Sequence, residues 1–350
     1  MLFRQLFDSD TCSFTYLLAG AQGREALIID PVYEKTDRYL KLLEELGLKL
    51  VKSIDTHIHA DHLTALGILR DKTNCITVMG KQSSADVVSM RVEDGDKIEI
   101  EGLCLDVMYT PGHTDDSYCF YMPGMVFTGD TLFIRGTGRT DFQAGSSLDA
   151  YDSLFNKLLK LPGDTLVYPG HDYKGDCSST IAEEMAFNPR LQVDCAESYA
   201  EIMDNLVLPN PKMMDVVVPE NQKIGMAQGE PEINQRTVSA YNALSQFKNK
   251  STLFIDLREN LERDKNGIIP NSIHMPYKSL ASFIRPGGLL HALSHQSEQQ
   301  LMLYCAFGER SAMALKELRS SEFTNICHLS GGIDAWINVS GPIGKPHKKN

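Results

Sequence analysis

Residues 55–62 read Asp55-Thr56-His57-Ile58-His59-Ala60-Asp61-His62, and this stretch gives the clearest indication of the fold. Val51–Asp55 is predicted to be a strand, and Ala60–Leu69 is predicted to be the helix that follows it. The histidines would then lie in a loop at the carboxyl end of a strand, where α/β folds usually place ligand chemistry. The stretch therefore predicts an α/β fold with a metal-type cluster at one edge of a sheet.

Three further candidate ligands stand in turn-like contexts, each after a predicted strand. They are His113 in Thr110-Pro111-Gly112-His113-Thr114, Asp130 in Thr128-Gly129-Asp130-Thr131, and His171 in Pro169-Gly170-His171-Asp172. A core would not gather so many polar groups at strand ends without a use, because burying them is costly. Imidazole suits Zn, Fe, Cu and Ni, and carboxylate extends the choice to harder ions, so residue type leaves the metal open.

A second reactive motif lies far downstream, at Cys305-Ala306-Phe307-Gly308-Glu309-Arg310-Ser311. Leu301–Cys305 is a predicted strand and Gly308–Leu318 a predicted helix, so the cysteine opens a strand-to-helix loop. Backbone N–H groups of such a loop, the positive helix end and Arg310 stabilise a thiolate or a bound persulfide. The loop therefore predicts a nucleophilic or sulfur-carrying thiolate at Cys305, held by Ala306, Phe307, Gly308, Glu309 and Ser311.

Composition and charge bound the class of protein. The chain has 350 residues, 42% of them hydrophobic, which is enough for two domains with separate cores. A formal net charge of −12 argues against nucleic acid or an anionic membrane as a partner. No apolar run is long enough to span a bilayer, and the first ten residues lack a signal-peptide core. The eight cysteines are scattered without a CxxC pair, so we expect a reduced, cytoplasmic protein.

The predicted elements divide the chain into two parts. Strands dominate at first, and helices such as Leu148–Leu159 and Ser179–Phe187 follow. Leu208–Glu232 is rich in Pro and Gly and predicts a domain tail and linker. Beyond it, helices and strands alternate as in a small parallel α/β domain: Thr237–Phe247, Thr252–Asp256, Leu301–Cys305, Gly308–Leu318 and Asn325–Leu329. We expect a first domain at 1–228, a linker at 229–236, a second domain at 237–345 and a basic tail at 346–350.

The metal motifs resemble those of the metallo-β-lactamase superfamily, whose signature is HxHxDH with a later His, Asp and His. The resemblance implies an αβ/βα sandwich over about the first 225 residues. Within the superfamily, the chain is similar to the persulfide dioxygenase branch. That similarity is carried by three segments: Phe127 to Gln143, Tyr168-Pro169-Gly170-His171-Asp172-Tyr173, and Asn188-Pro189-Arg190-Leu191.

This resemblance implies one non-haem Fe(II) per chain, held by His57, His113 and Asp130 as a facial triad. His59, Asp61, His62 and His171 would then orient the ligands through hydrogen bonds. The resemblance also implies that Arg139 and Tyr173 bind glutathione, since a guanidinium fork pairs well with a carboxylate. The alternative is a two-zinc hydrolase of the glyoxalase II type, in which the same seven residues hold both metals.

From about Thr237 to Gly344 the chain resembles a rhodanese domain. The supporting segments are Ile255-Asp256-Leu257-Arg258, Gly267 to Pro276, and Leu329 to Trp336. Two residues depart from the common pattern: Ala306 stands where many rhodaneses have Arg, and Ile268 where they usually have His. The first departure removes a charge near the sulfur, which leaves the sulfur donor open.

The order of the two domains is similar to that of bacterial persulfide dioxygenase and rhodanese fusions. We therefore expect Cys305 to transfer sulfane sulfur between thiosulfate and glutathione, and the iron domain to oxidise glutathione persulfide with O₂ to sulfite and glutathione. Two rivals are a zinc thioester hydrolase and a carrier module that stores sulfur for a partner. A homo-oligomer is compatible with the sequence.

Overall fold

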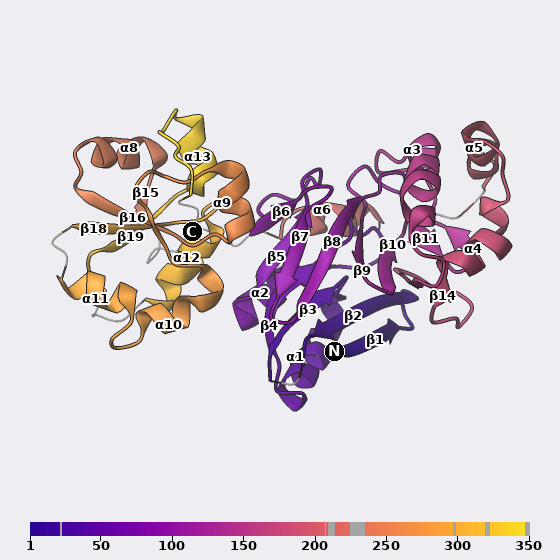
Figure 1. Ribbon diagram of the computed structural model, residues 1–350, viewed down its shortest axis with the longest axis horizontal. Coiled ribbons are helices and arrows are strands. Elements are labelled where there is room, and N and C mark those ends of the chain that lie inside the picture. Colours follow the sequence, from indigo (N-terminus) through magenta and orange to yellow (C-terminus); the bar gives the residue numbers. More distant parts are fainter. Residues whose placement is uncertain are drawn as a thin grey trace. The chain divides into compact units, whose positions relative to one another are not determined.

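The computed structural model describes residues 1–21, 23–206, 208, 214–224, 235–296, 299–318 and 323–346. They form two compact units, shown as ribbons in Figure 1. The first unit contains Met1–Asp86 and Arg91–Ile224, and the second contains Val87–Met90 and the described residues from 235 onward. Most of the expected linker (229–234) and of the expected basic tail (347–350) lies outside the described residues.

Two six-stranded sheets form the centre of the first unit. One has the order β1-β2-β3-β4-β5-β6 and the other the order β14-β13-β10-β9-β8-β7. The strands of the first sheet are β1 (Leu2–Asp8), β2 (Ser13–Ala19), β3 (Glu25–Ile29), β4 (Lys49–Ile54), β5 (Ile76–Gly80) and β6 (Met90–Val92). Those of the second are β7 (Lys97–Ile100), β8 (Leu103–Tyr109), β9 (Tyr118–Met122), β10 (Met125–Gly129), β13 (Leu166–Pro169) and β14 (Ser179–Thr180), and β11 (Leu132–Phe133) with β12 (Gly136–Thr137) form a small hairpin.

The two sheets face each other through aromatic side chains. Tyr16 of β2 lies 5.0 Å, ring to ring, from Phe127 of β10, which stacks on Tyr168 of β13 at 5.6 Å. The Tyr16 hydroxyl also donates to the Pro169 carbonyl. Large buried rings of this kind contribute much of the apolar area that holds two layers together.

Helices cover the outer faces of both sheets. On the first sheet, Tyr39 and Leu43 of α1 (Thr36–Glu45) pack with Leu17 and Ile28. On the second, Ala150, Ile181 and Tyr199 pack with Val126 and Val167. The described helical segments of this unit are η1 (Tyr33–Lys35), α1, α2 (Leu66–Thr73), α3 (Ser147–Asp152), η2 (Ser153–Lys157), η3 (Leu158–Lys160), α4 (Ile181–Phe187), η4 (Pro189–Leu191), α5 (Ala196–Asp204) and α6 (Met214–Asn221). The layers give the αβ/βα sandwich that was predicted.

One predicted helix begins later than expected. The sequence pattern predicts a helix from Ala60, but α2 begins only at Leu66, so the first part of that prediction is wrong. Residues 55–65 instead form a loop whose backbone is held by hydrogen bonds from outside the segment. In a helix through His59 and His62, the backbone N–H and C=O groups would bond to one another. In the loop, these groups remain available to hydrogen-bond partners from other parts of the chain.

The second unit has one five-stranded sheet of order β15-β19-β18-β16-β17, with every neighbouring pair parallel. Its strands are β15 (Thr237–Val238), β16 (Thr252–Asp256), β17 (Ile273–His274), β18 (Gln300–Tyr304) and β19 (Ile326–Leu329). Its described helices are α8 (Ala240–Lys248), α9 (Asn260–Asn266), η5 (Tyr277–Ser279), α10 (Leu280–Ile284), α11 (Leu289–Gln296), α12 (Glu309–Glu317) and α13 (Gly332–Asn338). Figure 1 shows α8 and α13 on one face of this sheet and α10 and α11 on the other.

The core of the second unit lies between its sheet and the pair α8 and α13. Phe254, Met302 and Trp336 are buried there together with Ala243 and Ile333. The predicted helix Thr237–Phe247 is shorter than expected, since Thr237 and Val238 pair with β19 as a strand. Ser239 then caps α8 by accepting a hydrogen bond from the Asn242 N–H, which fixes where the helix starts.

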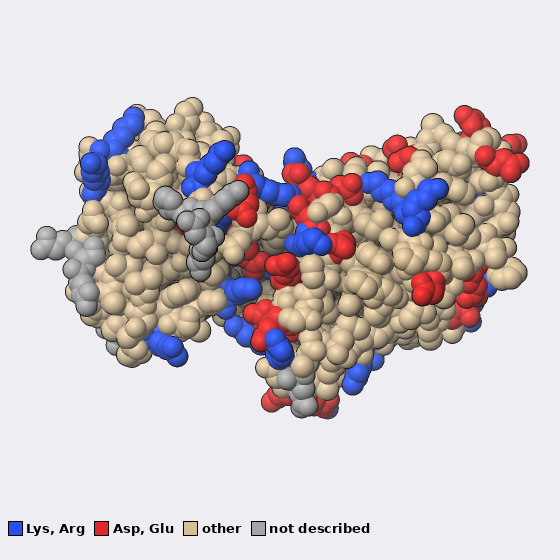
Figure 2. Space-filling model, in the orientation of Figure 1, with Lys and Arg blue, Asp and Glu red and all other residues tan. Residues whose placement is uncertain are grey.

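Charge and hydropathy at the surface agree with the composition. Figure 2 shows Asp and Glu side chains interspersed with Lys and Arg on the visible face of the first unit. Among the described helices, none is both long enough and apolar enough to cross a bilayer.

Candidate functional site

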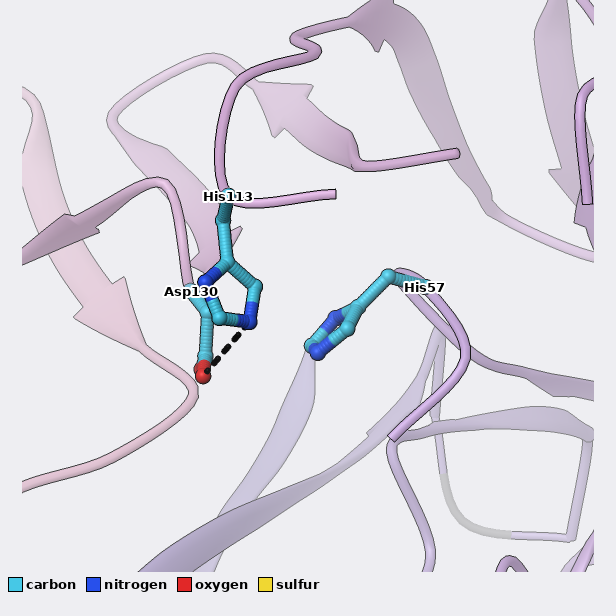
Figure 3. A group of neighbouring side chains, drawn as sticks. All are labelled: His57, His113 and Asp130. Carbon is cyan, nitrogen blue, oxygen red and sulfur yellow. Dashed lines mark ion pairs between the residues drawn. The ribbon is translucent and has the colours of Figure 1, made fainter. Parts of the chain in front are cut away.

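Three residues from separate loops of the first unit come together beside the sheet edges. His57 follows β4, His113 follows β8 and Asp130 follows β10. Each offers a ligand atom within 4.8 Å of those of the other two, and all three side chains are buried. Figure 3 shows the rings of His57 and His113 turned toward the Asp130 carboxylate, with His113 Nε2 3.5 Å from Asp130 Oδ2.

Hydrogen bonds fix which imidazole nitrogen faces this centre. The Arg139 carbonyl lies 2.7 Å from His113 Nδ1, so Nδ1 carries the proton and Nε2 keeps its lone pair. The Thr56 hydroxyl donates to Asp30, and it therefore accepts from Nδ1 of His57 at 2.9 Å. Burial, followed by the nearby His59, lowers the pKa of His57 well below its ordinary value. Both rings therefore direct Nε2 toward the centre, the nitrogen that binds a metal ion once it carries no proton.

Asp130 is prepared as an anionic ligand. Burial alone would raise its pKa, but His171, whose Nδ1 lies 2.7 Å from Asp130 Oδ1, holds that pKa below its ordinary value. The second carboxylate oxygen, Oδ2, faces His113. Two neutral nitrogens and one carboxylate oxygen around one point fit a single divalent transition-metal ion.

The backbone of Gly138 packs tightly against Asp130 and His113. A Cβ added to Gly138 would lie 2.0 Å from the Asp130 carbonyl oxygen and 2.9 Å from His113 Nδ1. Real Cβ atoms essentially never approach a heavy atom closer than 3.0 Å, so only glycine fits here without moving a ligand. The Gly138–Arg139 backbone therefore sets the position of His113.

The remaining predicted metal residues form a second group. His59, Asp61 and His62 also offer ligand atoms within 4.8 Å of one another. Asp61 Oδ2 is 2.9 Å from both His62 Nδ1 and His171 Nε2. His171 thus bridges the Asp61 and Asp130 carboxylates; burial would lower its pKa, but these two anions raise it well above the ordinary value. His59 Nδ1 and His62 Nε2 are buried and have no hydrogen-bond partner among the described residues, so a second cation could find ligands here.

Asn221 is a site residue that the sequence pattern did not indicate. Its side-chain amide donates to the carbonyls of His59 and His62 and accepts from the Thr64 N–H, all at 2.9–3.0 Å. It lies at the end of α6, in a segment whose Pro and Gly content predicts a linker. Its partners are backbone atoms, so no residue pattern marks it in advance.

Asp30 and Asp116 were also not indicated. Asp30 follows β3 and accepts hydrogen bonds from the backbone and the hydroxyl of Thr56 at 2.7 and 3.0 Å. Asp116 accepts from the Ile58 N–H at 3.2 Å. Both carboxylates therefore hold the backbone that carries His57.

The two predicted glutathione residues lie in different surroundings. Tyr173 is 70% exposed, and its ring stacks on that of His171, so it lies beside the metal residues. The Arg139 guanidinium is paired through two nitrogens with Asp141, both at 2.6 Å, and lies over the Phe142 ring. A substrate carboxylate at Arg139 would have to share that fork with Asp141.

The cysteine loop of the second unit has the predicted strand-to-helix geometry. Cys305 follows β18 and is buried, and its Sγ accepts a hydrogen bond from the Gly308 N–H at 3.2 Å. Gly308 has φ of 92°, a left-handed conformation that favours glycine, and α12 begins at the next residue. Ala306, Glu309 and Ser311 are buried and Phe307 is partly buried. Sulfur, N–H donor and helix start are therefore in place for a thiolate.

Arg310 lies in this loop, but its charge is already paired. It is fully buried, and two of its nitrogens contact the Glu262 carboxylate at 2.8 and 2.5 Å. The positive charge of Arg310 near the sulfur is therefore largely neutralised by Glu262. A direct role of its guanidinium in catalysis stays a prediction.

Comparisons with known proteins agree with this geometry. The model of the metallo-beta-lactamase superfamily matches residues 13–171, and that of the rhodanese-like domain matches residues 239–339. The mitochondrial persulfide dioxygenase ETHE1 of Homo sapiens is 44% identical over 229 residues, which cover 65% of this chain and 89% of that protein. The crystal structure of ETHE1 from Myxococcus xanthus is 48% identical, with a TM-score of 0.62 over 63% of this chain and 98% of that one.

A structure of a Staphylococcus aureus metallo-beta-lactamase aligns with 94% of this chain and 98% of its own, with a TM-score of 0.60. At 22% identity this likeness shows the fold alone. The identity to the human protein extends over most of that protein's length, and it therefore shows the family. The chain belongs to the persulfide dioxygenase family of the metallo-β-lactamase superfamily and carries a rhodanese-like domain after that unit.

Proposed function

We propose that the first unit is a glutathione-dependent persulfide dioxygenase with one Fe(II), held by His57, His113 and Asp130. The observation that carries the proposal is the buried triad of two imidazole Nε2 atoms and one carboxylate oxygen. The reaction takes glutathione persulfide, O₂ and water to sulfite and glutathione. A ferrous ion held by these three residues would bind the sulfur anion of the substrate and activate O₂.

The surrounding residues would then act on the ligands and on the substrate. The Arg139 carbonyl and the Thr56 hydroxyl hold the two imidazoles in the ligating tautomer. His171 holds Asp130 in its anionic form through one nitrogen and Asp61 through the other. Tyr173, exposed beside His171, is available to contact the glutathione part of the substrate.

We propose that the second unit is a sulfurtransferase. The Cys305 thiolate attacks the outer sulfur of thiosulfate, sulfite leaves, and a cysteine persulfide forms. A glutathione thiolate then attacks the outer sulfur of that persulfide, which gives glutathione persulfide and restores the Cys305 thiolate. The buried Sγ, its N–H donor and the α12 N-terminus support this assignment.

Two measurements test the proposal. Protein purified without added metal should contain about one iron per chain and should consume O₂ with glutathione persulfide. Asp130→Asn should lose iron and O₂ consumption while it still transfers sulfur from thiosulfate to glutathione. Cys305→Ser should show the reverse pattern, and Cys104→Ser, which changes an exposed cysteine of β8, is its matched control. Loss of both activities in either variant would contradict two independent sites.

A second candidate function rests on the His59, Asp61 and His62 group. Its two unpartnered nitrogens could hold a second metal, as in a two-zinc hydrolase of the glyoxalase II type. His171 argues against this, because both of its nitrogens already face carboxylates. Two zinc ions per chain and hydrolysis of lactoylglutathione without O₂ would favour the hydrolase.

A further inference from the structure

A row of three polar side chains lies behind the cysteine loop of the second unit. Thr237 of β15 and His328 of β19 are paired neighbours in the parallel sheet, and Thr237 Oγ1 lies 3.0 Å from His328 Nε2. His328 Nδ1 is 3.2 Å from the hydroxyl of Ser311 in α12, and that hydroxyl is 3.8 Å from Cys305 Sγ. His328 and Ser311 are fully buried, so water does not satisfy them.

The hydrogen bonds in this row have a single consistent direction. The Ser311 hydroxyl donates to the Gly308 carbonyl at 2.9 Å, so its oxygen accepts from the His328 Nδ1–H. In a neutral imidazole, Nε2 is then an acceptor, and the Thr237 hydroxyl donates to it. Burial, and then the charge of Arg236, lowers the pKa of His328 to about 4, which keeps the ring neutral. The Ser311 hydroxyl therefore keeps its own proton, which points to the Gly308 carbonyl and can turn to Cys305 Sγ, 3.8 Å away.

We propose that His328, supported by Thr237, is a positioning residue that directs the Ser311 hydroxyl to Cys305 Sγ. The inference rests on the proposed sulfurtransferase function of Cys305. When the glutathione thiolate attacks the cysteine persulfide, the Sγ–S bond breaks and its electron pair stays on Sγ. The Ser311 O–H rotates from the Gly308 carbonyl to this new anion, while the His328 Nδ1–H continues to hold the serine oxygen. Charge balances, because one thiolate is consumed and one is released.

Two other polar groups act on the same sulfur. The Gly308 N–H donates to Sγ at 3.2 Å, and Arg310 contributes the field of a charge that Glu262 largely neutralises. The serine hydroxyl is thus the one side-chain hydroxyl that the described contacts bring within reach of Sγ. Removing it should weaken the thiolate as a leaving group and raise the pKa of the thiol.

The test measures the apparent pKa of Cys305 in the full-length protein. The rate of alkylation by iodoacetamide is followed against pH on the Cys305 peptide by mass spectrometry, so other cysteines do not interfere. Ser311→Ala should raise this pKa by about one unit and lower kcat for sulfur transfer about tenfold, since a hydrogen bond to a charged group is lost. His328→Leu should move both values in the same direction, and the double variant should show no further change.

Two conservative variants separate positioning from packing. His328→Asn places an amide N–H close to the position of Nδ1–H and should recover most of the wild-type pKa and kcat. Thr237→Val lets the imidazole adopt the other tautomer, which turns the Ser311 proton away from the sulfur, and should lower kcat about threefold. Circular dichroism melting checks that each variant is folded.

The proposal is overturned if His328→Leu or Thr237→Val leaves the thiol pKa unchanged, or if His328→Asn falls as low as His328→Leu. Additive effects of Ser311→Ala and His328→Leu would overturn it as well. Should His328→Leu fail to fold, the Asn and Val variants decide the outcome. Wild-type protein without sulfurtransferase activity would refute the proposed function. Alkylation needs no turnover, so the thiol pKa values of the variants would still test the positioning role of His328 in that case.

Discussion

Gly138→Ala should abolish tight metal binding without unfolding the protein. The new Cβ would lie 2.0 Å from the Asp130 carbonyl oxygen, and reaching 3.0 Å requires a relative shift of at least 1.0 Å between residue 138 and the segment that carries Asp130. Metal–ligand distances are held to within about 0.2 Å, so this shift is several times the tolerance. Overpacking of this kind costs about 1–3 kcal/mol, too little to unfold a domain of this size.

The expected loss of metal affinity is at least about 100-fold, the upper end of what outer hydrogen-bond partners of a metal site contribute. Fe(II) under nitrogen, and Zn(II) as a second probe, would be titrated against a chromophoric chelator. Gly136→Ala is the matched control, because its Cβ would meet only Phe133, at 3.8 Å. That control should bind both ions within about twofold of the wild type.

Two results would refute the reasoning. If Gly138→Ala bound metal as tightly as the wild type, then His113 and Asp130 would not be ligands, or their loops would move freely. If Gly136→Ala lost affinity equally, the hairpin as a whole, and not the contact with Asp130, would control the site.

Three further predictions concern single side chains. Asn221→Ala leaves two carbonyls and one N–H of the histidine loop unpaired, so it should destabilise that loop by about 3 kcal/mol and speed its hydrogen exchange, read by mass spectrometry over residues 55–65. Glu262→Gln leaves Arg310 as a buried unpaired charge and should destabilise the second unit by about 3–5 kcal/mol in urea, followed by the fluorescence of Trp336, the single tryptophan of the chain; an unchanged midpoint would contradict the ion pair. His328 has a pKa of about 4 in the folded protein and about 6.5 in the unfolded chain, so the unfolded chain binds the extra proton below pH 6.5; stability should be full above that pH, be about 2 kcal/mol lower at pH 5, and lose this dependence in His328→Asn.

Much of the fold could be predicted because the spacing of apolar residues and the positions of Gly and Pro are local properties of the sequence. The strand Thr252–Asp256, for example, has the predicted bounds. The start of α2 could not be predicted in this way. The amide of Asn221, about 160 residues later in the chain, holds the loop before α2, and no local signal reports a partner so distant.

In the site, the roles of side chains could be predicted from the sequence, and the roles of backbone atoms could not. His57, His113 and Asp130 could be grouped from the sequence because each has ligand chemistry and follows a strand. The sequence indicates Arg139 by its guanidinium, yet in the structure the carbonyl of Arg139 contacts the triad, where it accepts a hydrogen bond from His113 Nδ1. Any residue has a carbonyl, so this role depends on the close approach of the Gly138 backbone to Asp130 and His113 and cannot be recognised from residue types.

The charge at the cysteine loop illustrates how distant partners change a role. Arg310 suggests a cation beside the sulfur, but Glu262 from α9 pairs with it inside the protein, and Ala306 stands where many rhodaneses have a second arginine. A buried ion pair has little net field compared with a free guanidinium, because the two charges oppose each other. On the proposed sulfurtransferase function, a Cys305 anion would therefore be stabilised mainly by neutral donors, the Gly308 N–H and the Ser311 hydroxyl. Neutral donors act only in good alignment, so the left-handed turn at Gly308 and the imidazole behind Ser311 matter as much here as charge does elsewhere.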